Sequence, residues 1–389
     1  MVAFIASVTA RASRTSDGNL TEIMRNHNLP AVAASYDDGV SGFKQAQVGV
    51  HKVGTAIAAT SSDLWHLGSN TKAMVAMAIG LLIQDELLSW DTQLQKVFNK
   101  NGTGITLSKG SGEITIAHLS SHTAGLSDKA LFDDTEMSAR MYGVDAATGR
   151  LLYSNISLSR PPTHRQGVYE YANIDYVILG LIIDVIAGVP AEAHIQSRLF
   201  EPLNMTSAGW GPLPEAFTTS AEQPYPHSAN GTLGLGGPPI PYPVDQSYSF
   251  RDYPPALHTA GMAHMTMQDY NKWLRLHVDE DLQVAVNVSK QTLAMLHRPH
   301  PETNMSSEGY GYTYGAWIRV DSDTDSGHLI VHDGSNLLNY FTAAVDIVHN
   351  VTVAVATNVG GMIVDGAAWI EGVHLARDGL LTRDLNIAG

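Results

Sequence analysis

The spacing of apolar residues changes character twice along this chain. Residues 31–54 carry two runs with strand-like alternation around a polar turn, after an amphipathic segment at 19–27 that predicts a first helix. Between about residues 100 and 250, helical patterns alternate with Gly- and Pro-rich connections, of which 212–243 predicts a long ordered loop. The last third contains β-rich runs separated by turns, which predict an antiparallel sheet and a closing helix within 366–381.

Strands at both ends of the chain, with helices between them, predict an α/β (α+β) fold whose sheet is built from two separated segments. We expect a discontinuous sheet domain formed by residues 1–68 and 250–389, in which terminal helices flank the antiparallel sheet. Residues 69–249 would form a mainly helical domain that includes the Pro- and Gly-rich loop. An active site is expected at the interface of these two parts.

Ser69 and Lys72 stand three residues apart at the start of an apolar, helix-like run that extends to about Leu87. If Ser69 opens this helix, the offset places both side chains on one face, with the amine one turn above the hydroxyl. The unpaired N–H groups of a helix N-terminus favour an oxygen that becomes negative during a reaction. The pattern therefore fits an activated serine nucleophile, although taken alone it fits an ordinary serine cap better.

The chain contains a second Ser-x-x-Lys sequence and two Tyr-x-Asn sequences. The predicted secondary structure around each copy indicates which one is the catalytic candidate. Ser41 and Lys44 enter a predicted strand, where a three-residue offset puts side chains on opposite faces. A buried lysine can act as a base once burial favours its neutral form, and a nearby tyrosine can share that task. Tyr171 lies at a loop-to-helix junction, whereas the tripeptide of Tyr153 ends in a sequon asparagine. We therefore select Tyr171.

The composition excludes several classes of function. The formal charge of −15, from 38 acidic and 23 basic residues, argues against a nucleic-acid partner. The chain has no cysteine, which excludes disulfides, thiolate metal sites and cysteine nucleophiles. The longest charge-free apolar runs, such as 73–83, are shorter than the roughly 20 residues that span a bilayer. We expect no cofactor and no metal, and His118 and His122, which lack the glutamate of a zinc-protease helix, are interpreted as helix-packing residues.

Asn-x-Ser/Thr sequons are more frequent than the roughly three that chance would give for this composition. They begin at Asn19, Asn101, Asn155, Asn204, Asn230, Asn287, Asn304 and Asn350. The excess predicts a secreted, glycosylated protein, although residues 1–12 would make a poor signal peptide because no basic residue precedes their apolar run. The alternative is chance enrichment in a cytosolic protein.

Three short motifs follow one another in a specific order. Ser69-Asn70-Thr71-Lys72 is followed, after ITIAHLSSHTAGL, by Tyr171-Ala172-Asn173 and then by His332-Asp333-Gly334 on a late predicted strand. In order, spacing and structural context they resemble the serine β-lactamase-type superfamily, which includes class C β-lactamases, DD-peptidases, D-aminopeptidases and family VIII carboxylesterases. The resemblance covers nearly the whole chain. It implies a β-lactamase/transpeptidase-like fold.

The resemblance also implies the catalytic roles. Ser69 would be the acylated nucleophile, and Lys72 its base or proton relay. Tyr171 would pass protons to the leaving atom. Which of Lys72 and Tyr171 is the main base stays open, because two coupled groups share the titration.

The implied binding residues are Asn173, His332, Gly334 and Ser335. Asn173 would support the site by hydrogen bonding, and the N–H of Ser335 would join that of Ser69 in stabilising the oxyanion. His332 stands at a position where the family has a lysine or a histidine. A histidine is neutral or only partly charged near pH 7 and is a weaker anchor for a substrate carboxylate. Neutral esters or amides are therefore favoured over penicillin-type substrates.

We therefore expect a serine hydrolase that cleaves a small ester, amide or peptide through an acyl-enzyme on Ser69, as an esterase, an amidase or a D-aminopeptidase-like enzyme. Neither a nucleic-acid partner nor a membrane span is expected, and the oligomeric state stays open. One alternative is an acyltransferase of the same architecture, in which an alcohol or amine replaces water. The other is a catalytically silent homologue that only binds a ligand, against which the presence of all three catalytic groups argues.

Overall fold

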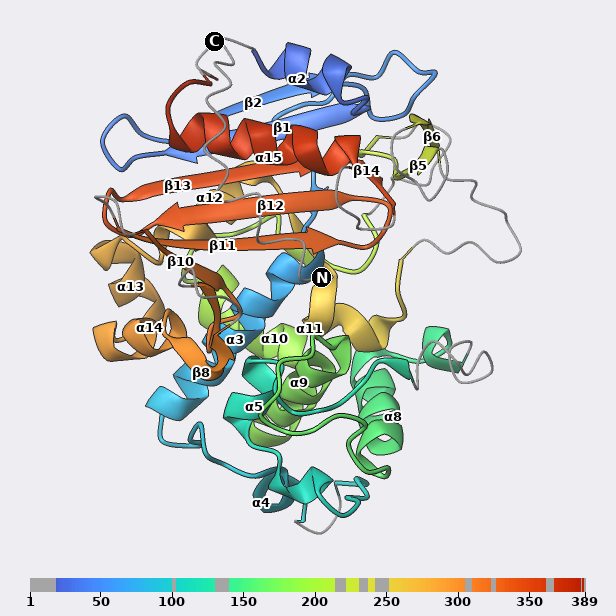
Figure 1. The fold of residues 1–389 in the computed structure, drawn as a ribbon, viewed down its shortest axis with the longest axis vertical. Coiled ribbons are helices and arrows are strands. Elements are labelled where there is room, and N and C mark those ends of the chain that lie inside the picture. Colours follow the sequence, from blue (N-terminus) through green and yellow to red (C-terminus); the bar gives the residue numbers. More distant parts are fainter. Residues whose placement is uncertain are drawn as a thin grey trace.

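The described part of the chain contains an eight-stranded antiparallel sheet above a group of helices (Figure 1). The structure is a computed structural model that describes residues 19–99, 103–129, 140–213, 222–230, 237–241, 252–304, 310–322, 327–361, 367–385 and 387. The strand order is β2-β1-β13-β12-β11-β10-β9-β8. The N-terminal strand β1 therefore pairs with the C-terminal strand β13, which confirms that two separated segments build the sheet.

Successive side chains along the central strands point to opposite faces of the sheet, and both faces are buried. The strands of this sheet are β1 (Ala31–Asp37), β2 (Lys44–Gly49), β8 (Pro299–Asn304), β9 (Tyr310–Thr313), β10 (Ile318–Ser322), β11 (Gly327–Ser335), β12 (Tyr340–Asp346) and β13 (Val351–Thr357). In β1, Val32 and Ala34 belong to one apolar cluster, whereas Ala31 and Ala33 belong to another. This two-residue period is what a strand buried on both faces requires.

Two terminal helices cover one face of the sheet, as predicted (Figure 1). These are α2 (Leu20–Asn26) and α15 (Ala368–Leu381). The side chain of Asn19 accepts a hydrogen bond from Glu22 N–H and so caps α2. Trp369 is buried in the cluster between α15 and the sheet.

The helix that begins just after Ser69 is buried on all sides. A 3₁₀ turn at Gly68–Asn70 leads into α3 (Thr71–Gln84), which has apolar residues around its whole circumference and packs against α9, α10, α11 and α14. The other helices are α4 (Leu94–Phe98), α5 (Ile116–Ser120), α8 (Ala146–Leu158), α9 (Asn173–Ala187), α10 (Ala191–Ile195), α11 (His258–Gly261), α12 (Met267–Arg275), α13 (Glu280–Val286) and α14 (Lys290–Leu296).

Two three-stranded sheets tie the helical part to the main sheet. One consists of β3 (Trp65–His66), β7 (Ala263–Met265) and β4 (Gly209–Trp210), and the other of β14 (Val359–Gly360), β5 (His227–Asn230) and β6 (Gly237–Pro241). The predicted loop 212–243 thus contains two short strands, and its remaining parts lie partly outside the described residues. Strand β5, in the predicted helical part, pairs with β14 near the C-terminus. The predicted domain boundary at 249 stays a prediction.

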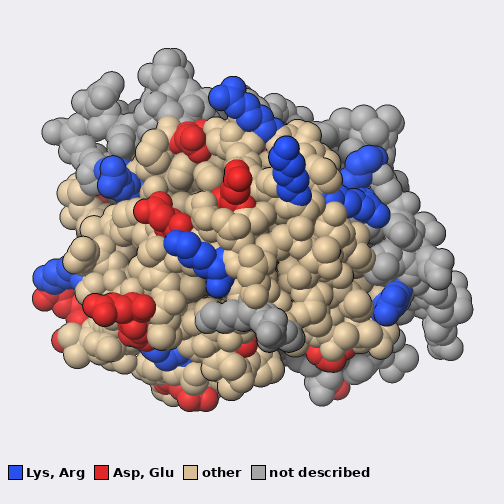
Figure 2. Space-filling view, turned by 90° about the horizontal axis from the view of Figure 1, so that it is seen from below, with Lys and Arg blue, Asp and Glu red and all other residues tan. Residues whose placement is uncertain are grey.

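The surface carries charges of both signs. Figure 2 shows acidic and basic side chains interspersed over the lower face of the molecule. In the described ranges, no single helix is both long and apolar enough to cross a membrane, whereas α9 and the following segment to Phe200 meet that test only as a pair bent by 76°. The sequon residues Asn19, Asn204 and Asn287 are exposed, and residues 1–12 lie outside the described part, so secretion stays a prediction.

Candidate active site

Ser69 lies on the 3₁₀ turn that leads into α3, at the point where the sheet meets the helices. Its side chain is partly exposed, whereas its neighbours Gly68 and Asn70 are buried. The hydroxyl oxygen of Ser69 accepts hydrogen bonds from Lys72 Nζ at 3.0 Å and from the Tyr171 hydroxyl at 2.7 Å. The structure thus brings together the three side chains that the sequence predicted as catalytic groups.

Lys72 is completely buried and has three oxygen partners. Besides Ser69 Oγ, its Nζ donates to Asn173 Oδ1 at 2.8 Å and to the carbonyl oxygen of Ala260 at 2.5 Å. Burial lowers the pKa of Lys72 to about 7, although the nearby carboxylate of Asp128 acts in the opposite direction. A substantial fraction of Lys72 is therefore neutral at physiological pH.

Tyr171 reaches the nucleophile from the loop before α9. Its ring lies over Lys72, with Nζ 4.8 Å from the ring centroid. Burial raises the pKa of Tyr171 above its usual range, and the hydrogen bond to Ser69 only partly opposes this shift. Tyr171 therefore remains a phenol, which can donate a proton, at every pH where the protein is expected to work.

Asp128 is a site residue that reasoning from the sequence missed. Its Oδ2 accepts from the N–H of Asn173 at 2.9 Å and from Asn173 Nδ2 at 3.0 Å, and its Oδ1 accepts from Ile174 N–H at 2.8 Å. The carboxylate thus caps the start of α9 from a distant loop. Because Nδ2 of Asn173 is held by Asp128, Oδ1 of the same amide must face Lys72.

Replacing Asp128 by alanine is expected to lower turnover about tenfold, because the Asn173 amide loses the acceptor that orients it toward Lys72. Asp145→Ala is a matched control, since Asp145 caps the separate helix α8 through Thr148 N–H. Both variants should lose about 1 kcal/mol of stability with their helix cap. Steady-state kinetics and thermal unfolding measure the two effects, and equal turnover in both variants would contradict the orienting role of Asp128.

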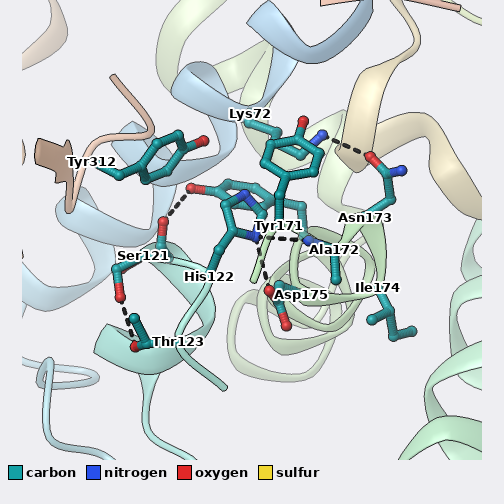
Figure 3. A network of polar contacts seen from close by, with 12 residues as sticks. Lys72, Ser121, His122, Thr123, Tyr171, Ala172, Asn173, Ile174, Asp175 and Tyr312 are labelled. Carbon is teal, nitrogen blue, oxygen red and sulfur yellow. Dashed lines mark hydrogen bonds and ion pairs between the residues drawn. The ribbon is translucent and has the colours of Figure 1, made fainter. Parts of the chain in front are cut away.

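The imidazole ring of His122 lies against the Tyr171 ring at a tilted angle (Figure 3). The two ring centroids are 4.3 Å apart, and His122 Nδ1 is 2.8 Å from Asp175 Oδ2. Burial lowers the pKa of His122 and raises that of Asp175, so that both favour their neutral forms. The two histidines, His118 and His122, do not share one helix, because α5 ends at Ser120 and His122 adopts a left-handed φ of 58°, but His122 does pack against a helix, since it contacts Asp175 of α9. The same histidine side chain contacts the ring of Tyr171.

Two glycines allow the expected oxyanion donors to approach each other. A methyl group on Gly68 would lie 2.3 Å from the nitrogen of Ser335, and one on Gly334 would lie 2.6 Å from the nitrogen of Ser69. No side-chain carbon tolerates such distances, so only glycine permits this contact between the two backbones. The segments that carry the N–H groups of Ser69 and Ser335 are therefore in direct contact.

His332 lies on the same strand, β11, and only 4% of it is exposed. Its Nε2 is 3.3 Å from the hydroxyl of Tyr312. Burial lowers the pKa of His332 to about 4, so the ring is neutral at pH 7. Its role in substrate binding stays a prediction.

Known proteins resemble this chain in sequence, and a solved structure resembles it in fold. A family model described as Beta-lactamase matches residues 17–378. Penicillin-binding protein 4 of Amycolatopsis lactamdurans is 26% identical over 319 residues, which cover 80% of this chain and 76% of that protein. The putative penicillin-binding protein PbpX of Bacillus subtilis (strain 168) is 25% identical over 281 residues, 72% of this chain and 59% of that protein. This chain thus matches about three fifths of the length of PbpX.

One solved structure has a fold similar to that of this chain. The D-amino acid amidase from Ochrobactrum anthropi SV3, complexed with L-phenylalanine, superposes with a TM-score of 0.68 at 20% identity. The match covers 94% of this chain and 97% of the amidase. The arrangement of sheet and helices in this chain is therefore the one found in that protein.

Proposed function

The chain belongs to the beta-lactamase family, and we propose that it is a serine hydrolase that cleaves esters or amides through an acyl-enzyme on Ser69. Three side chains carry this proposal: the partly exposed hydroxyl of Ser69, the buried amine of Lys72 and the phenol of Tyr171. They form the nucleophile, the base and the proton donor that acyl transfer requires.

The hydrogen-bond partners of Lys72 support the role of base for this residue. A neutral amine has two N–H groups and one lone pair. The carbonyl oxygen of Ala260 and the Oδ1 of Asn173 accept these two N–H groups, which leaves the lone pair directed at Ser69 Oγ. In the neutral form, Lys72 is thus poised to accept the proton of Ser69. This is the single observation on which the proposal rests most heavily.

The reaction then proceeds in two stages. Lys72 takes the proton of Ser69 while Oγ attacks the substrate carbonyl carbon, and the N–H groups of Ser69 and Ser335 stabilise the negative oxygen that forms. Tyr171 donates its proton to the leaving oxygen or nitrogen and is then reprotonated from Lys72. In the second stage a water molecule takes the place of the leaving group, gives a proton to the Lys72–Tyr171 pair and attacks the acyl carbon. The bond from this carbon to Ser69 Oγ then breaks, Oγ takes the proton back, and the carboxylic acid leaves.

The electrostatics of the site favour a substrate without a free carboxylate near the scissile bond. His332 stands where a lysine could hold such a carboxylate, but its low pKa leaves it uncharged at neutral pH. The nearby Asp128 raises the pKa of Lys72, and a carboxylate at that position would not attract an anion. Esters and amides without a free carboxylate are therefore the proposed substrates. They include D-amino acid amides, the class that the name of the similar amidase indicates.

The proposal is tested by labelling and by paired substrates. A fluorophosphonate should form one adduct, which peptide mapping places on Ser69. The paired substrates are a D-alanyl-D-alanine peptide and its methyl ester, compared with p-nitrophenyl esters and with D- and L-aminoacyl anilides. We expect cleavage of the D-alanyl-D-alanine amide bond, measured through the shortened peptide, to be faster in the methyl ester than in the free acid. Absence of any adduct would support the silent homologue, and transfer to an added alcohol in preference to water would support the acyltransferase.

Replacing Tyr171 by phenylalanine is expected to lower turnover roughly a hundredfold, because the leaving atom loses its proton donor. Esters with the weakly basic p-nitrophenolate leaving group should be affected least, since this group departs without a proton. Tyr153→Phe is the control, as Tyr153 belongs to the other Tyr-x-Asn sequence and makes only 3.4 Å contacts to Asp128. The same loss for activated and unactivated substrates would remove Tyr171 from proton donation.

A further inference from the structure

A second polar network lies behind the two oxyanion N–H groups. Its centre is His66 on β3, whose Nδ1 accepts a hydrogen bond from Gly68 N–H at 3.1 Å. The other ring nitrogen, Nε2, lies 2.7 Å from Oδ2 of Asp252. Only 1% of each of these two side chains is exposed. Since Gly68 directly precedes Ser69, the network holds the peptide next to the first oxyanion donor.

The same carboxylate also reaches the second donor. Asp252 Oδ1 accepts from Asn336 Nδ2 at 3.2 Å and from Tyr253 N–H at 2.9 Å. Asn336 directly follows Ser335, and its own Oδ1 accepts from the N–H groups of Leu338 and Asn339. A continuous chain of hydrogen bonds therefore joins the residue before Ser69 to the residue after Ser335.

We propose that His66 and Asp252 are positioning residues that fix the two oxyanion N–H donors relative to each other. This role rests on the proposed function, because it matters only if an oxyanion forms between these donors. The Gly68–Gly334 contact keeps the two backbones close, whereas the network limits how they can slide or rotate. Neither side chain touches the reacting atoms.

The network allows only one protonation pattern of His66. Gly68 N–H requires an acceptor at Nδ1, and Asp252 Oδ2 requires a donor at Nε2. Asp252→Asn keeps the shape of the side chain but reverses this pattern. Two donors, from Asn336 and Tyr253, hold the Oδ1 atom, so the new Nδ2 must face His66. His66 would then accept at Nε2 and carry its proton at Nδ1, opposite the N–H of Gly68.

Asp252→Asn is therefore expected to lower kcat for p-nitrophenyl butyrate by about tenfold to a hundredfold with little change in KM, because the oxyanion exists only in the transition state. The affinity of a boronic acid, which forms a tetrahedral adduct with Ser69, should fall by a similar factor. His66→Phe should have the same effect, and the double variant should be no slower than either single variant, because both changes act through Gly68 N–H.

Asp63→Asn provides the matched control. Asp63 forms another buried pair, in which its Oδ2 lies 2.8 Å from His51 Nε2. The exposed fraction is 2% for the Asp63 side chain and 4% for that of His51. The kcat of the Asp63→Asn variant, expressed per Ser69 labelled by fluorophosphonate, should stay within about twofold of the wild-type value. Its thermal stability should fall as it does in Asp252→Asn. A kcat per labelled serine in Asp252→Asn that equals the value in Asp63→Asn would overturn the positioning role alone. A wild-type protein that is neither labelled nor active would overturn the proposed function, and the positioning role with it.

Discussion

Replacing Ser69 by alanine is expected to lower the turnover of ester substrates by roughly 10⁴-fold or more, because the variant has no atom that can carry the acyl group. The hydrogen bonds of Lys72 and Tyr171 converge on Ser69 Oγ, so its removal leaves the base and the proton donor without their target. Acyl-enzyme formation should disappear together with turnover. Hydrolysis rates and the intact mass of the protein after mixing with substrate measure the two losses.

Ser41→Ala is the control for this experiment, because Ser41 begins the other Ser-x-x-Lys sequence of the chain. Ser41 lies in an exposed turn before β2, where its hydroxyl donates to Asp38 Oδ2 at 3.1 Å. This variant should retain the turnover and the Ser69 adduct of the wild type. Turnover in Ser69→Ala that approaches the wild-type rate would mean that another nucleophile carries the reaction.

The catalytic groups could be predicted from the sequence to the extent that local structure determines them. Ser69 and Lys72 meet because a helix places residues three apart on one face, a relation that holds wherever the helix lies. Ser41 and Lys44 have the same spacing, but the structure places Lys44 in β2 and Ser41 in the turn before it. The strands of the C-terminal third were likewise predictable, since alternation within β13 and its neighbours is a local property.

The residues that complete the site depend on contacts across the fold. Asp128 caps α9 from a loop 45 residues away, and the Ala260 carbonyl reaches Lys72 across 188 positions. Neither contact can be predicted from the spacing of residues along the chain. The two histidines of HLSSH do not share one helix, although their period suggests it, because the chain leaves the helix after Ser120 and turns the ring of His122 against that of Tyr171. The short strands β5 and β6 pair with each other, and β5 also pairs with β14 far along the sequence, so the Pro- and Gly-rich pattern of 212–243 does not by itself predict them.

The rate of the wild-type enzyme is expected to rise with pH through about pH 7 and then to level off. The reason is that Lys72 must be neutral to accept the proton of Ser69, and burial lowers the pKa of Lys72 to about 7. Below that pH the ammonium form holds all three of its protons and has no lone pair to offer. A plot of kcat/KM against pH for an uncharged ester, whose own ionisation does not change, measures the free enzyme's pKa.

Lys72→Ala should lower turnover by roughly 10³-fold and abolish this pH dependence, because the titrating base has been removed. An added primary amine can occupy the vacated space, so methylamine should restore part of the rate in proportion to its free-base concentration. Lys44→Ala, in the other Ser-x-x-Lys sequence, should keep both the rate and the pH profile of the wild type. A wild-type pH profile that persists in Lys72→Ala would assign the titration, and with it the role of base, to another group. Rescue by methylamine would instead locate the missing proton acceptor at the position of Nζ, beside Asn173 and the Ala260 carbonyl.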